Sequence, residues 1–587
     1  MSGGRANGSE SRGRRNGHVL VWEQPGLEEN DKPVRKRRAL VGTRHVVTFM
    51  IFLGMANAYV MRTNMSVAIV AMVNHTAITE HQEIVTNECQ IDYTNSTTSD
   101  SSHKDGEFEW DTKKQGYLLS SFFYGYVITQ IPFGILAKRY GSKYFLGVGM
   151  LINSLFGLLV PVSAHWGFPW LMVVRFIQGL GEEIYHEMVQ LCLARTHCWQ
   201  SGYHQTRGAG WEPSSMLVSS YSAIFFNVAL LYIPIHLESR ESSGYFNASN
   251  HCVLLATMEL ESQEWTFLVL SLLSIGAQFG TVISMPLSGL LSEYGFAGGW
   301  PSIFYVFGAV GTIWCIAFLI MVYEDPESHP HISEDEKKYI LSALWGNAGA
   351  SSPPVPWKSI VTSMPFWAIL MAHMGQNYGY ETLMTELPTF MKQILHFDIK
   401  SNGTVSSLPY LAMWIFSMLI SHVADWMIST EKFNHTVTRK IINSIGQYGP
   451  AVALVAASYT GCNPWLTISL LTIGVGLNGG IYSGFKVNHL DISPRFAGVL
   501  MSFTNCLANL AGLLAPIIAG HIIVGTPTQH KWRIVFVISA AVYVVCATVY
   551  VIFGSGERQS WDNPDKDEEK NNSKELEGVK TVNETQH

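Results

Sequence analysis

Charged residues are scarce in this sequence. Asp, Glu, Lys and Arg make up 14% of the 587 residues, whereas roughly 25% is usual in a soluble globular domain. Hydrophobic residues make up 48%, and the polar residues gather at the two ends and in a few loops. This distribution excludes a set of soluble domains joined by polar linkers, and with it a soluble enzyme. It predicts an all-α protein that crosses a lipid bilayer many times.

Cysteine is also sparse, and its spacing is uninformative. The eight cysteines are scattered, and several lie inside apolar runs, as Cys315, Cys506 and Cys546 do. Because neither a disulfide framework nor a metal-ligand pattern is present, we expect small buried side chains at these positions and no bound metal or cofactor. The net charge of −7 lies mostly outside the apolar runs, and it indicates no nucleic-acid partner.

Long uncharged runs define the spans, since about 20 residues cross a hydrocarbon core of about 30 Å. Nine runs contain no Asp, Glu, Lys or Arg: 117–137, 145–164, 267–291, 301–323, 405–423, 441–461, 465–485, 497–523 and 534–554. Three more are apolar but interrupted: 46–73 by Arg62, 170–181 by Arg175, and 365–391 by Glu381 and Glu386. Together they predict about 12 transmembrane helices. The polar first 40 residues contain no cleavable signal peptide.

The distribution of lysine and arginine predicts the orientation. The basic run 32–38 precedes the first span and places the N-terminus in the cytosol. The next loop, 74–110, holds one lysine and eight acidic residues, with N-glycosylation sequons at Asn74 and Asn95. We therefore expect it to be luminal or extracellular, and glycosylated. Counting spans from there returns the long middle loop and the polar C-terminal tail to the cytosol.

A short basic motif suggests the fold. Residues 134–143 read GILAKRYGSK, which resembles the signature between the second and third helices of the major facilitator superfamily. Its residues are Gly134, Lys138, Arg139 and Gly141, with Lys138 where the superfamily usually has Asp. A counterpart at 421–425, SHVAD, keeps the acid as Asp425. Two matches at pseudo-symmetric positions indicate two six-helix halves, 44–323 and 365–555, joined by a cytosolic loop, 324–364, with disordered cytosolic tails at 1–43 and 556–587.

Narrower motifs are similar to those of the solute carrier 17 family, which includes sialin, the vesicular glutamate transporters and sodium–phosphate transporters. The resemblance covers residues 44–555 apart from one gap, and it rests on 62–68 (RTNMSVA), 122–132 (FFYGYVITQIP), 175–182 (RFIQGLGE), 276–284 (GAQFGTVIS) and 488–494 (NHLDISP). Segments 365–369 (PFWAI) and 406–411 (SSLPYL) are similar to sialin in particular, which we expect to be the nearest member. The resemblance implies a transporter of small organic anions that works by alternating access.

Arg62 is the first candidate site residue. It lies well inside an apolar run, where burying a permanent cation costs at least about 2.5 kcal/mol. A guanidinium can grip a substrate carboxylate through two hydrogen bonds. The alternatives are an interhelical ion pair and a head group that reaches the membrane surface. The family resemblance implies the first, because the matching arginine there binds the substrate anion.

Arg175 and Glu182 form the second candidate. They are seven residues apart and share one helix face, so they can pair directly or through intervening groups. A carboxyl group shielded from water is suited to carrying a proton. Resemblance to sialin implies that Glu182 carries the proton and that Arg175 is its electrostatic partner; a structural ion pair is the alternative. Gln178 stands where sialin has an acid, which puts part of that proton pathway in doubt.

Further polar residues suggest the substrate and the gate. Members that carry glutamate have an arginine at the position of Gln376, so its absence argues against glutamate. Hydroxyl and amide groups suited to a sugar acid come from Tyr124, Tyr126, Gln376, Asn377 and Tyr378, although aromatic packing would also explain the tyrosines. We interpret Asn488, His489 and Asp491, at the end of a span, as gate structure; direct contact with the substrate is the alternative.

The resemblance is interrupted between residues 183 and 275. We expect an atypical insertion there between helices four and five, produced by a translated intron or an aberrant exon. Its uncharged run 216–235 is expected to lie at the membrane surface, because a thirteenth span would invert the second half. The prediction is a monomeric, proton-coupled transporter of sialic acid or another acidic sugar in a lysosomal, vesicular or plasma membrane. The alternatives are a sodium-coupled carrier of phosphate or organic anions, and a receptor or scaffold that does not transport because helix four is disrupted.

Overall fold

The computed structural model describes residues 43–74, 106–140, 143–182, 263–323, 355–430 and 432–562, with a few positions between 329 and 337. The first half of this region contains α1 (Thr43–Met72), α3 (Thr112–Tyr140), α4 (Lys143–Trp166), a helical segment over 168–182, α8 (Gln263–Tyr294) and α9 (Pro301–Met321). Each overlaps one of the six spans predicted for this half. Most of the two tails, most of the loops 74–110 and 324–364, and the predicted surface helix at 216–235 lie outside the described residues. Residues 556–562, predicted as the start of a disordered tail, are folded onto the second half, because the Ser493 hydroxyl donates to the buried Asp562 carboxylate (2.9 Å).

The second half begins with the short α11 (Trp357–Val361). It continues with α12 (Met364–Gln393), α13 (Ile399–Ser429), α14 (His435–Ala457), α15 (Pro464–Asn478), η1 (Gly479–Tyr482), α16 (Phe485–Ile492), α17 (Ala497–Ile523), α18 (Gln529–Phe553) and η2 (Ser560–Asp562). Taken with the first half, these elements form twelve spanning segments within the described ranges. The fold is the predicted all-α membrane fold, and the protein crosses the membrane many times.

The tenth span differs from its prediction. The uncharged run 465–485 predicted one continuous helix, but the chain forms α15, the 3₁₀ turn η1 and α16. Glycine explains the break, because a Cβ atom on Gly479 would stand 2.6 Å from the Met413 carbonyl oxygen. The missing side chain therefore lets η1 pack directly on the backbone of α13. The span consequently extends to Ile492 and carries the 488–491 motif with it.

Polar side chains determine where several helices of the second half begin. Asp398, Asn434, Asn463 and Thr528 precede α13, α14, α15 and α18, and each accepts a hydrogen bond from the backbone N–H three residues later. These bonds satisfy amide groups that have no partner inside the helix.

Seven spans are long and apolar enough to cross a bilayer by length and composition alone: Val46–Met72, Lys143–Trp166, Pro301–Met321, Ile399–Ser429, Pro464–Ile492, Ala497–Ile523 and Gln529–Phe553.

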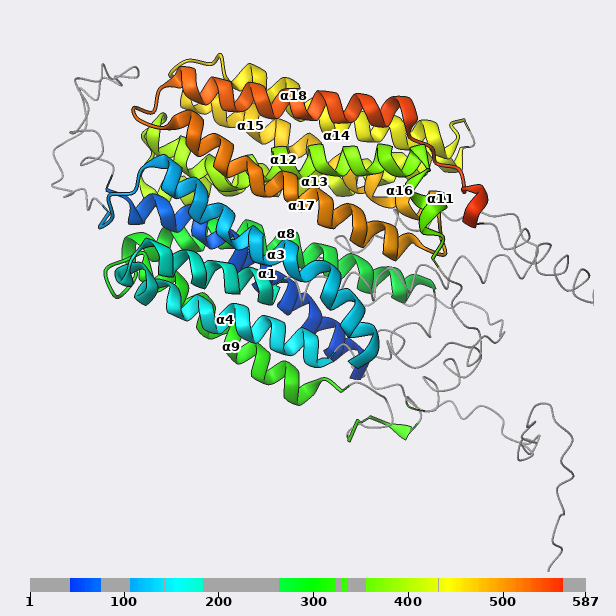
Figure 1. The fold of residues 1–587 in the computed structure, drawn as a ribbon, viewed down its shortest axis with the longest axis horizontal. Coiled ribbons are helices and arrows are strands. Elements are labelled where there is room, and N and C mark those ends of the chain that lie inside the picture. The colour runs from blue at the N-terminus through cyan, green and yellow to red at the C-terminus, as the bar shows by residue number, and fades with distance from the viewer. Residues whose placement is uncertain are drawn as a thin grey trace, which may run out of the picture. The chain divides into compact units, whose positions relative to one another are not determined.

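The two halves share one packing scheme. In the first half α1 packs against α8 and α9, and α4 packs against α9; in the second half α12 packs against α17 and α18, and α14 packs against α18. The halves meet where α3 packs against α17 and α8 against α13, and Figure 1 shows the two groups of helices side by side. Position for position, these pairings are those of two repeats related by a two-fold axis.

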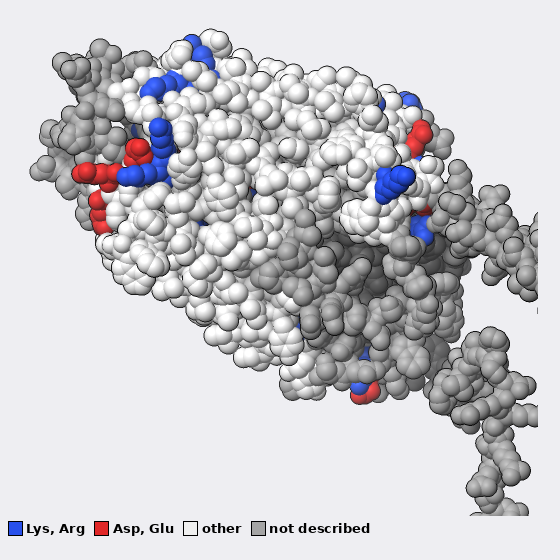
Figure 2. All heavy atoms as spheres, in the orientation of Figure 1, with Lys and Arg blue, Asp and Glu red and all other residues white. Residues whose placement is uncertain are grey.

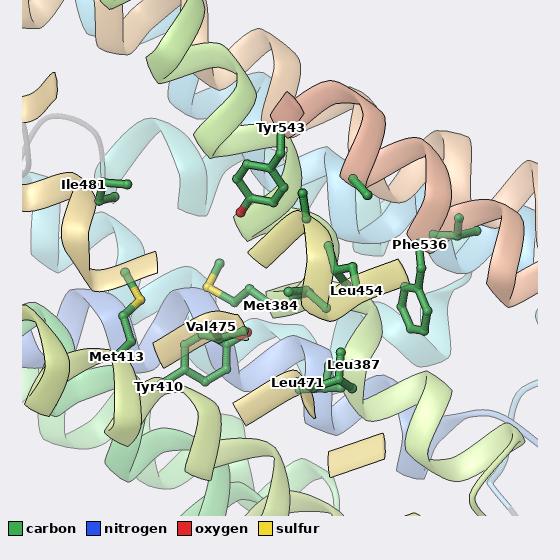
Figure 3. Close-up of a cluster of buried hydrophobic side chains, with 14 of the residues drawn as sticks. Met384, Leu387, Tyr410, Met413, Leu454, Leu471, Val475, Ile481, Phe536 and Tyr543 are labelled. Carbon is green, nitrogen blue, oxygen red and sulfur yellow. The ribbon is translucent and has the colours of Figure 1, made fainter. Parts of the chain in front are cut away.

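Apolar side chains stabilise the second half from within. Figure 3 shows Met384 and Leu387 of α12 among side chains from α13, α14, α15 and α18, including Tyr410, Leu454, Leu471 and Tyr543. Because lipid is as apolar as these side chains, close packing rather than escape from water holds such helices together. The surface charges have a different distribution: on the face in Figure 2, Lys, Arg, Asp and Glu gather near the two ends of the helices, with an uncharged surface between them.

The halves touch closely at the ends predicted to be luminal. The Thr112 hydroxyl donates to the Gly520 carbonyl (3.1 Å), and the Ser120 hydroxyl donates to the Leu513 carbonyl (2.9 Å). A Cβ atom on Gly116 would stand 2.4 Å from the Pro516 carbonyl oxygen. A Cβ atom on Gly403 would stand 2.5 Å from the Met285 carbonyl oxygen. We call these α3–α17 and α8–α13 contacts the luminal seal, and they close this side of the helix bundle.

Candidate functional site

Arg62 lies where the two halves meet. It is on α1, its side chain is 8% exposed, and its Nη2 atom donates to the Glu381 Oε1 atom of α12, whose side chain is 2% exposed. The guanidinium carbon lies 5.0 Å from the centre of the Phe123 ring and 5.4 Å from that of Tyr126, both on α3. The Tyr59 ring, one turn earlier on α1, is 5.8 Å away. The cation is therefore held by an acid from the opposite half and by three aromatic faces.

The Arg62–Glu381 pair uses only part of each group. Within the described part of the chain, Arg62 Nε and Glu381 Oε2 are buried without a hydrogen-bond partner. An arginine and a carboxylate can form two parallel hydrogen bonds, so a single bond leaves a donor free on one side and an acceptor free on the other. An unpartnered donor on a buried cation is suited to receive an anion. The structure thus shows the interhelical ion pair and leaves one guanidinium donor without a hydrogen bond.

Glycines bring the surrounding helices close to this pair. A Cβ atom on Gly512 of α17 would stand 3.0 Å from the Glu381 Cγ atom. On the other side, a Cβ atom on Gly125 of α3 would stand 2.1 Å from the Phe176 carbonyl oxygen, and one on Gly179 would stand 1.9 Å from the Phe122 carbonyl oxygen. Helix α3 and the 168–182 segment therefore cross with their backbones in contact. This crossing brings Arg175 over the Phe122 ring, 4.9 Å from its centre.

Arg175 and Glu182 are linked through other groups. Arg175 Nη1 donates to Gln178 Oε1 (3.0 Å), Gln178 Nε2 donates to the Asn153 carbonyl (3.3 Å), and Asn153 Nδ2 donates to Glu182 Oε2 (3.1 Å). All four side chains are buried. Of the two arrangements left open by the sequence, the described residues show the indirect one. The helix is intact through Glu182, and the expected disruption of helix four beyond it lies outside the described residues.

The polar residues of α12 form hydrogen bonds with polar residues of the neighbouring helices. Gln376 and Asn478 of α15 exchange two amide hydrogen bonds, of 2.5 and 2.7 Å. Asn377 Nδ2 donates to Asn509 Oδ1 of α17 (3.0 Å). A substrate could bind the Gln376 side chain only if its hydrogen bonds with Asn478 were broken. Tyr378 is buried beside them.

The two predicted tyrosines of α3 differ in their surroundings. Tyr126 is 1% exposed and lies under Arg62, whereas Tyr124 is 38% exposed. Residues two apart on a helix point to different faces. The structure therefore brings Tyr126 to the Arg62 site and leaves Tyr124 on the exposed side of α3.

A second buried ion pair lies at the predicted cytosolic end. Arg439 of α14 donates through Nε and Nη2 to the two carboxylate oxygens of Asp491, at 2.7 and 3.3 Å, and through Nη1 to the Ser483 carbonyl (2.9 Å). The rest of the 488–491 motif is also engaged: Asn488 Nδ2 donates to the Tyr550 hydroxyl (2.8 Å), and His489 Nε2 lies 2.8 Å from the Thr504 hydroxyl. These contacts tie α16 to α14, α17 and α18, as a structural part of a gate requires.

Asp425, the acid of the second signature motif, is buried on α13. Both of its carboxylate oxygens have no hydrogen-bond partner among the residues that the structure describes. Gly134, Lys138 and Arg139 are in the helical backbone of α3, and their side chains lie outside the described part, as does Gly141.

The two predicted glycosylation sites are placed differently. Asn74 lies two residues after the end of α1, and its backbone N–H donates to the Phe108 carbonyl (2.9 Å). Asn95 lies outside the described residues. Glycosylation of both stays a prediction.

Several functional candidates were missed from the sequence. Glu381 was noted only as an interruption of a span, although the reasoning applied to Arg62, that a charge at membrane depth needs a partner, applies equally to it. Arg439, which precedes the uncharged run 441–461, was not singled out. A further contact between the halves, from Gln278 Nε2 of α8 to the Tyr482 hydroxyl of η1 (2.5 Å), carries no charge and left no signal in the sequence.

Comparison with known proteins now agrees with this architecture. The sequence profile of the Major Facilitator Superfamily matches residues 47–196 and 267–516, which is more than half of the chain. The chain belongs to this superfamily. The unmatched stretch, 197–266, lies inside the predicted atypical block of 183–275, and the match continues past Glu182 as far as residue 196.

Three similar proteins refine the assignment. A Drosophila melanogaster protein named "Putative inorganic phosphate cotransporter" is 58% identical over 95% of this chain and 93% of its own length. Human sialin is 35% identical over 88% of this chain and 90% of its own length. The crystal structure of a D-xylose–proton symporter matches with a TM-score of 0.55 at 12% identity, covering 88% of this chain and 99% of that one.

These relatives place the chain in the solute carrier 17 family and among secondary transporters rather than enzymes. The symporter structure supports the fold alone. Identity to the fly protein is higher than identity to sialin, although sialin was expected to be the nearest member. The substrate and the coupling ion are therefore taken up as proposals.

Proposed function

We propose that this chain is a cation-coupled transporter of a small anion and that Arg62 binds the anion. The observation that carries this proposal is the Arg62–Glu381 pair: a buried permanent cation with a free donor, at the junction of the two halves. Burying such a charge costs free energy, and a charged residue inside a membrane span is therefore a functional-site candidate. Discontinuous spans and midplane sites between repeats are typical of secondary transporters.

Transport proceeds by rocking of the two halves about the α3–α17 and α8–α13 contacts. With the luminal seal closed, breaking the Gln278–Tyr482 contact would open the Arg62 site to the cytosolic side. Opening the seal while Gln278 and Tyr482 stay in contact would expose the site to the lumen or exterior instead. Alternation between the two arrangements moves the anion across the bilayer.

Inorganic phosphate is the substrate we propose first. The printed name of the 58% identical fly relative supports phosphate, and an arginine fork binds phosphate as readily as a carboxylate. An acidic sugar such as sialic acid is the second candidate, supported by 35% identity to sialin and by the amides and hydroxyls near the site. Glutamate is disfavoured by Gln376, which replaces the second cation of the glutamate carriers.

The coupling ion is proposed to be a proton, with Na⁺ as the alternative. Glu182 is the proton carrier implied by the resemblance to sialin, and its link to Arg175 through Gln178 and Asn153 provides a buried polar connection within the first half. The carrier is proposed to act as a monomer in a lysosomal, vesicular or plasma membrane. Co-localisation of the tagged chain with markers of each membrane tests the location.

Uptake into proteoliposomes tests the function. The full chain is reconstituted and supplied with labelled phosphate, sialic acid or glutamate, under a proton gradient, a sodium gradient or neither. We expect saturable phosphate uptake that a proton gradient drives. Uptake of sialic acid in place of phosphate would favour the second candidate. A correctly folded chain that moves none of the three would favour the receptor or scaffold alternative.

A further inference from the structure

Glu381 competes with any substrate anion for the same cation. It is the acid bound to Arg62, both side chains are buried, and the two residues are 319 positions apart in the sequence and in opposite halves. An incoming anion that takes Arg62 must leave Glu381 as a second buried negative charge beside it. Two anions sharing one cation in a low-dielectric site repel each other strongly. The site therefore needs one further positive charge for each anion it binds.

We propose that Glu381, in addition to Glu182, couples the driving proton to anion binding; this inference rests on the proposed function of the Arg62 site. In the empty carrier the Glu381 carboxylate pairs with Arg62. When an anion arrives, a proton from the aqueous phase bonds to the free Oε2 atom, the Arg62–Glu381 ion pair breaks, and Arg62 pairs with the anion. When the anion carries one negative charge, as dihydrogen phosphate does, one positive and one negative charge enter together and the net charge of the site is unchanged.

The geometry favours a proton over a metal cation at Glu381. A sodium ion needs several oxygen ligands, whereas Glu381 offers one free oxygen, Oε2, next to a guanidinium. The Thr385 hydroxyl of the same helix donates to the Glu381 backbone carbonyl (2.7 Å) and not to its side chain. A single unpartnered oxygen can accept a proton without any further ligand.

Titratable groups surround the Arg62–Glu381 pair on several of the packed elements. Arg62 and Tyr59 are on α1, and Tyr126 on α3 contacts the same guanidinium. The other groups that interact electrostatically with the pair are Glu182 of the 168–182 segment, Tyr380 on α12 itself, Tyr410 of α13, Lys486 of α16 and Tyr543 of α18. Helix α17 presents Gly512 at this point. Glu182 is the one other acid in this set, and its carboxylate accepts a hydrogen bond from Asn153 in the first half.

The test separates exchange from accumulation in the reconstituted full chain. Glu381→Gln keeps the shape of the side chain but cannot take up a proton. We expect it to retain equilibrium exchange of labelled phosphate at a rate near that of the wild type, and to lose proton-driven accumulation by about tenfold or more. Glu386→Gln is the matched control, because Glu386 is also buried on α12 but does not form the ion pair with Arg62. It should accumulate phosphate normally.

A binding measurement provides a second, independent readout. Purified wild-type protein should take up about one proton per phosphate bound, and its affinity should fall about tenfold per pH unit once Glu381 has lost its proton. In Glu381→Gln only the pH dependence caused by the titration of phosphate itself should remain. Glu381→Asp should restore part of the pH dependence.

Three results would overturn the inference. They are normal accumulation by Glu381→Gln, loss of exchange together with accumulation in a folded Glu381→Gln protein, and a sodium requirement in place of a proton requirement in the wild type. If the wild type itself transports none of the tested anions, the proposed function fails instead, which the uptake assay above shows first.

Discussion

Arg62→Lys is the substitution that most directly tests the anion site. Lysine keeps the positive charge but replaces the planar fork by a single ammonium on a flexible stem. The ammonium can still pair with Glu381, whose carboxylate is the only ionic partner of Arg62 among the described residues. It cannot also supply the second donor, the role that the free Nε atom has in the wild type. The ion pair between the halves should therefore survive while substrate binding weakens.

The size of the effect follows from the bonds lost. A hydrogen bond to a charged group contributes about 1.5–3 kcal/mol, and 1.4 kcal/mol corresponds to a factor of about ten. Losing one such bond to the anion should lower the ratio of maximal uptake rate to KM by roughly 10- to 100-fold. Thermal unfolding in detergent should change little, because the charge and its partner remain.

The assay is initial-rate uptake in proteoliposomes, normalised to the amount of folded protein. Arg533→Lys is the matched control: Arg533 is on α18, lies 4.4 Å from the Tyr459 ring and is remote in the fold from Arg62. It should transport like the wild type. Wild-type uptake by Arg62→Lys would refute the assignment of Arg62 as the anion-binding residue.

Three other predictions test the frame around the site. Gly116→Ala should force α3 away from α17 and lower stability by about 1–3 kcal/mol, whereas Gly476→Ala, whose new methyl group would meet only an ordinary 3.4 Å contact, should be nearly neutral in thermal unfolding. Arg439→Met should destabilise by about 3–5 kcal/mol because it leaves Asp491 buried without its cation, and a second change, Asp491→Leu, should recover most of the lost melting temperature. Removing residues 197–266, which the superfamily profile leaves unmatched, should preserve uptake or raise it. Loss of uptake in the folded deletion variant would show that the segment is required.

The spans were predictable because the membrane leaves few choices. A segment that crosses lipid must be apolar for about 20 residues and must satisfy its own backbone hydrogen bonds. The first-half helices and most of the second-half ones therefore appear close to where the uncharged runs place them. The break in the tenth span could not be predicted in this way. It depends on how closely Gly479 approaches the backbone of α13, which is distant in the sequence.

The site was predictable in part. Arg62 could be singled out because a lone charge in an apolar run is costly wherever it stands. Gln376 could be singled out as a polar side chain in an apolar run. Its reciprocal pairing with Asn478 could not be predicted, since the two residues are 102 positions apart in the sequence. Tyr124 and Tyr126 look equivalent in the sequence, and only the packing of α3 decides which one faces the arginine.

The sequence by itself determined that this protein is a membrane transporter, because hydrophobic run lengths, charge placement and paired signature motifs are local properties. Only the tertiary structure decided which charges neutralise one another. Arg62 meets Glu381, and Arg439 meets Asp491, through helices that pack together from distant parts of the chain. Electrostatic pairing depends on distance in space, and a one-dimensional pattern shows that a buried charge needs a partner without showing which residue supplies it.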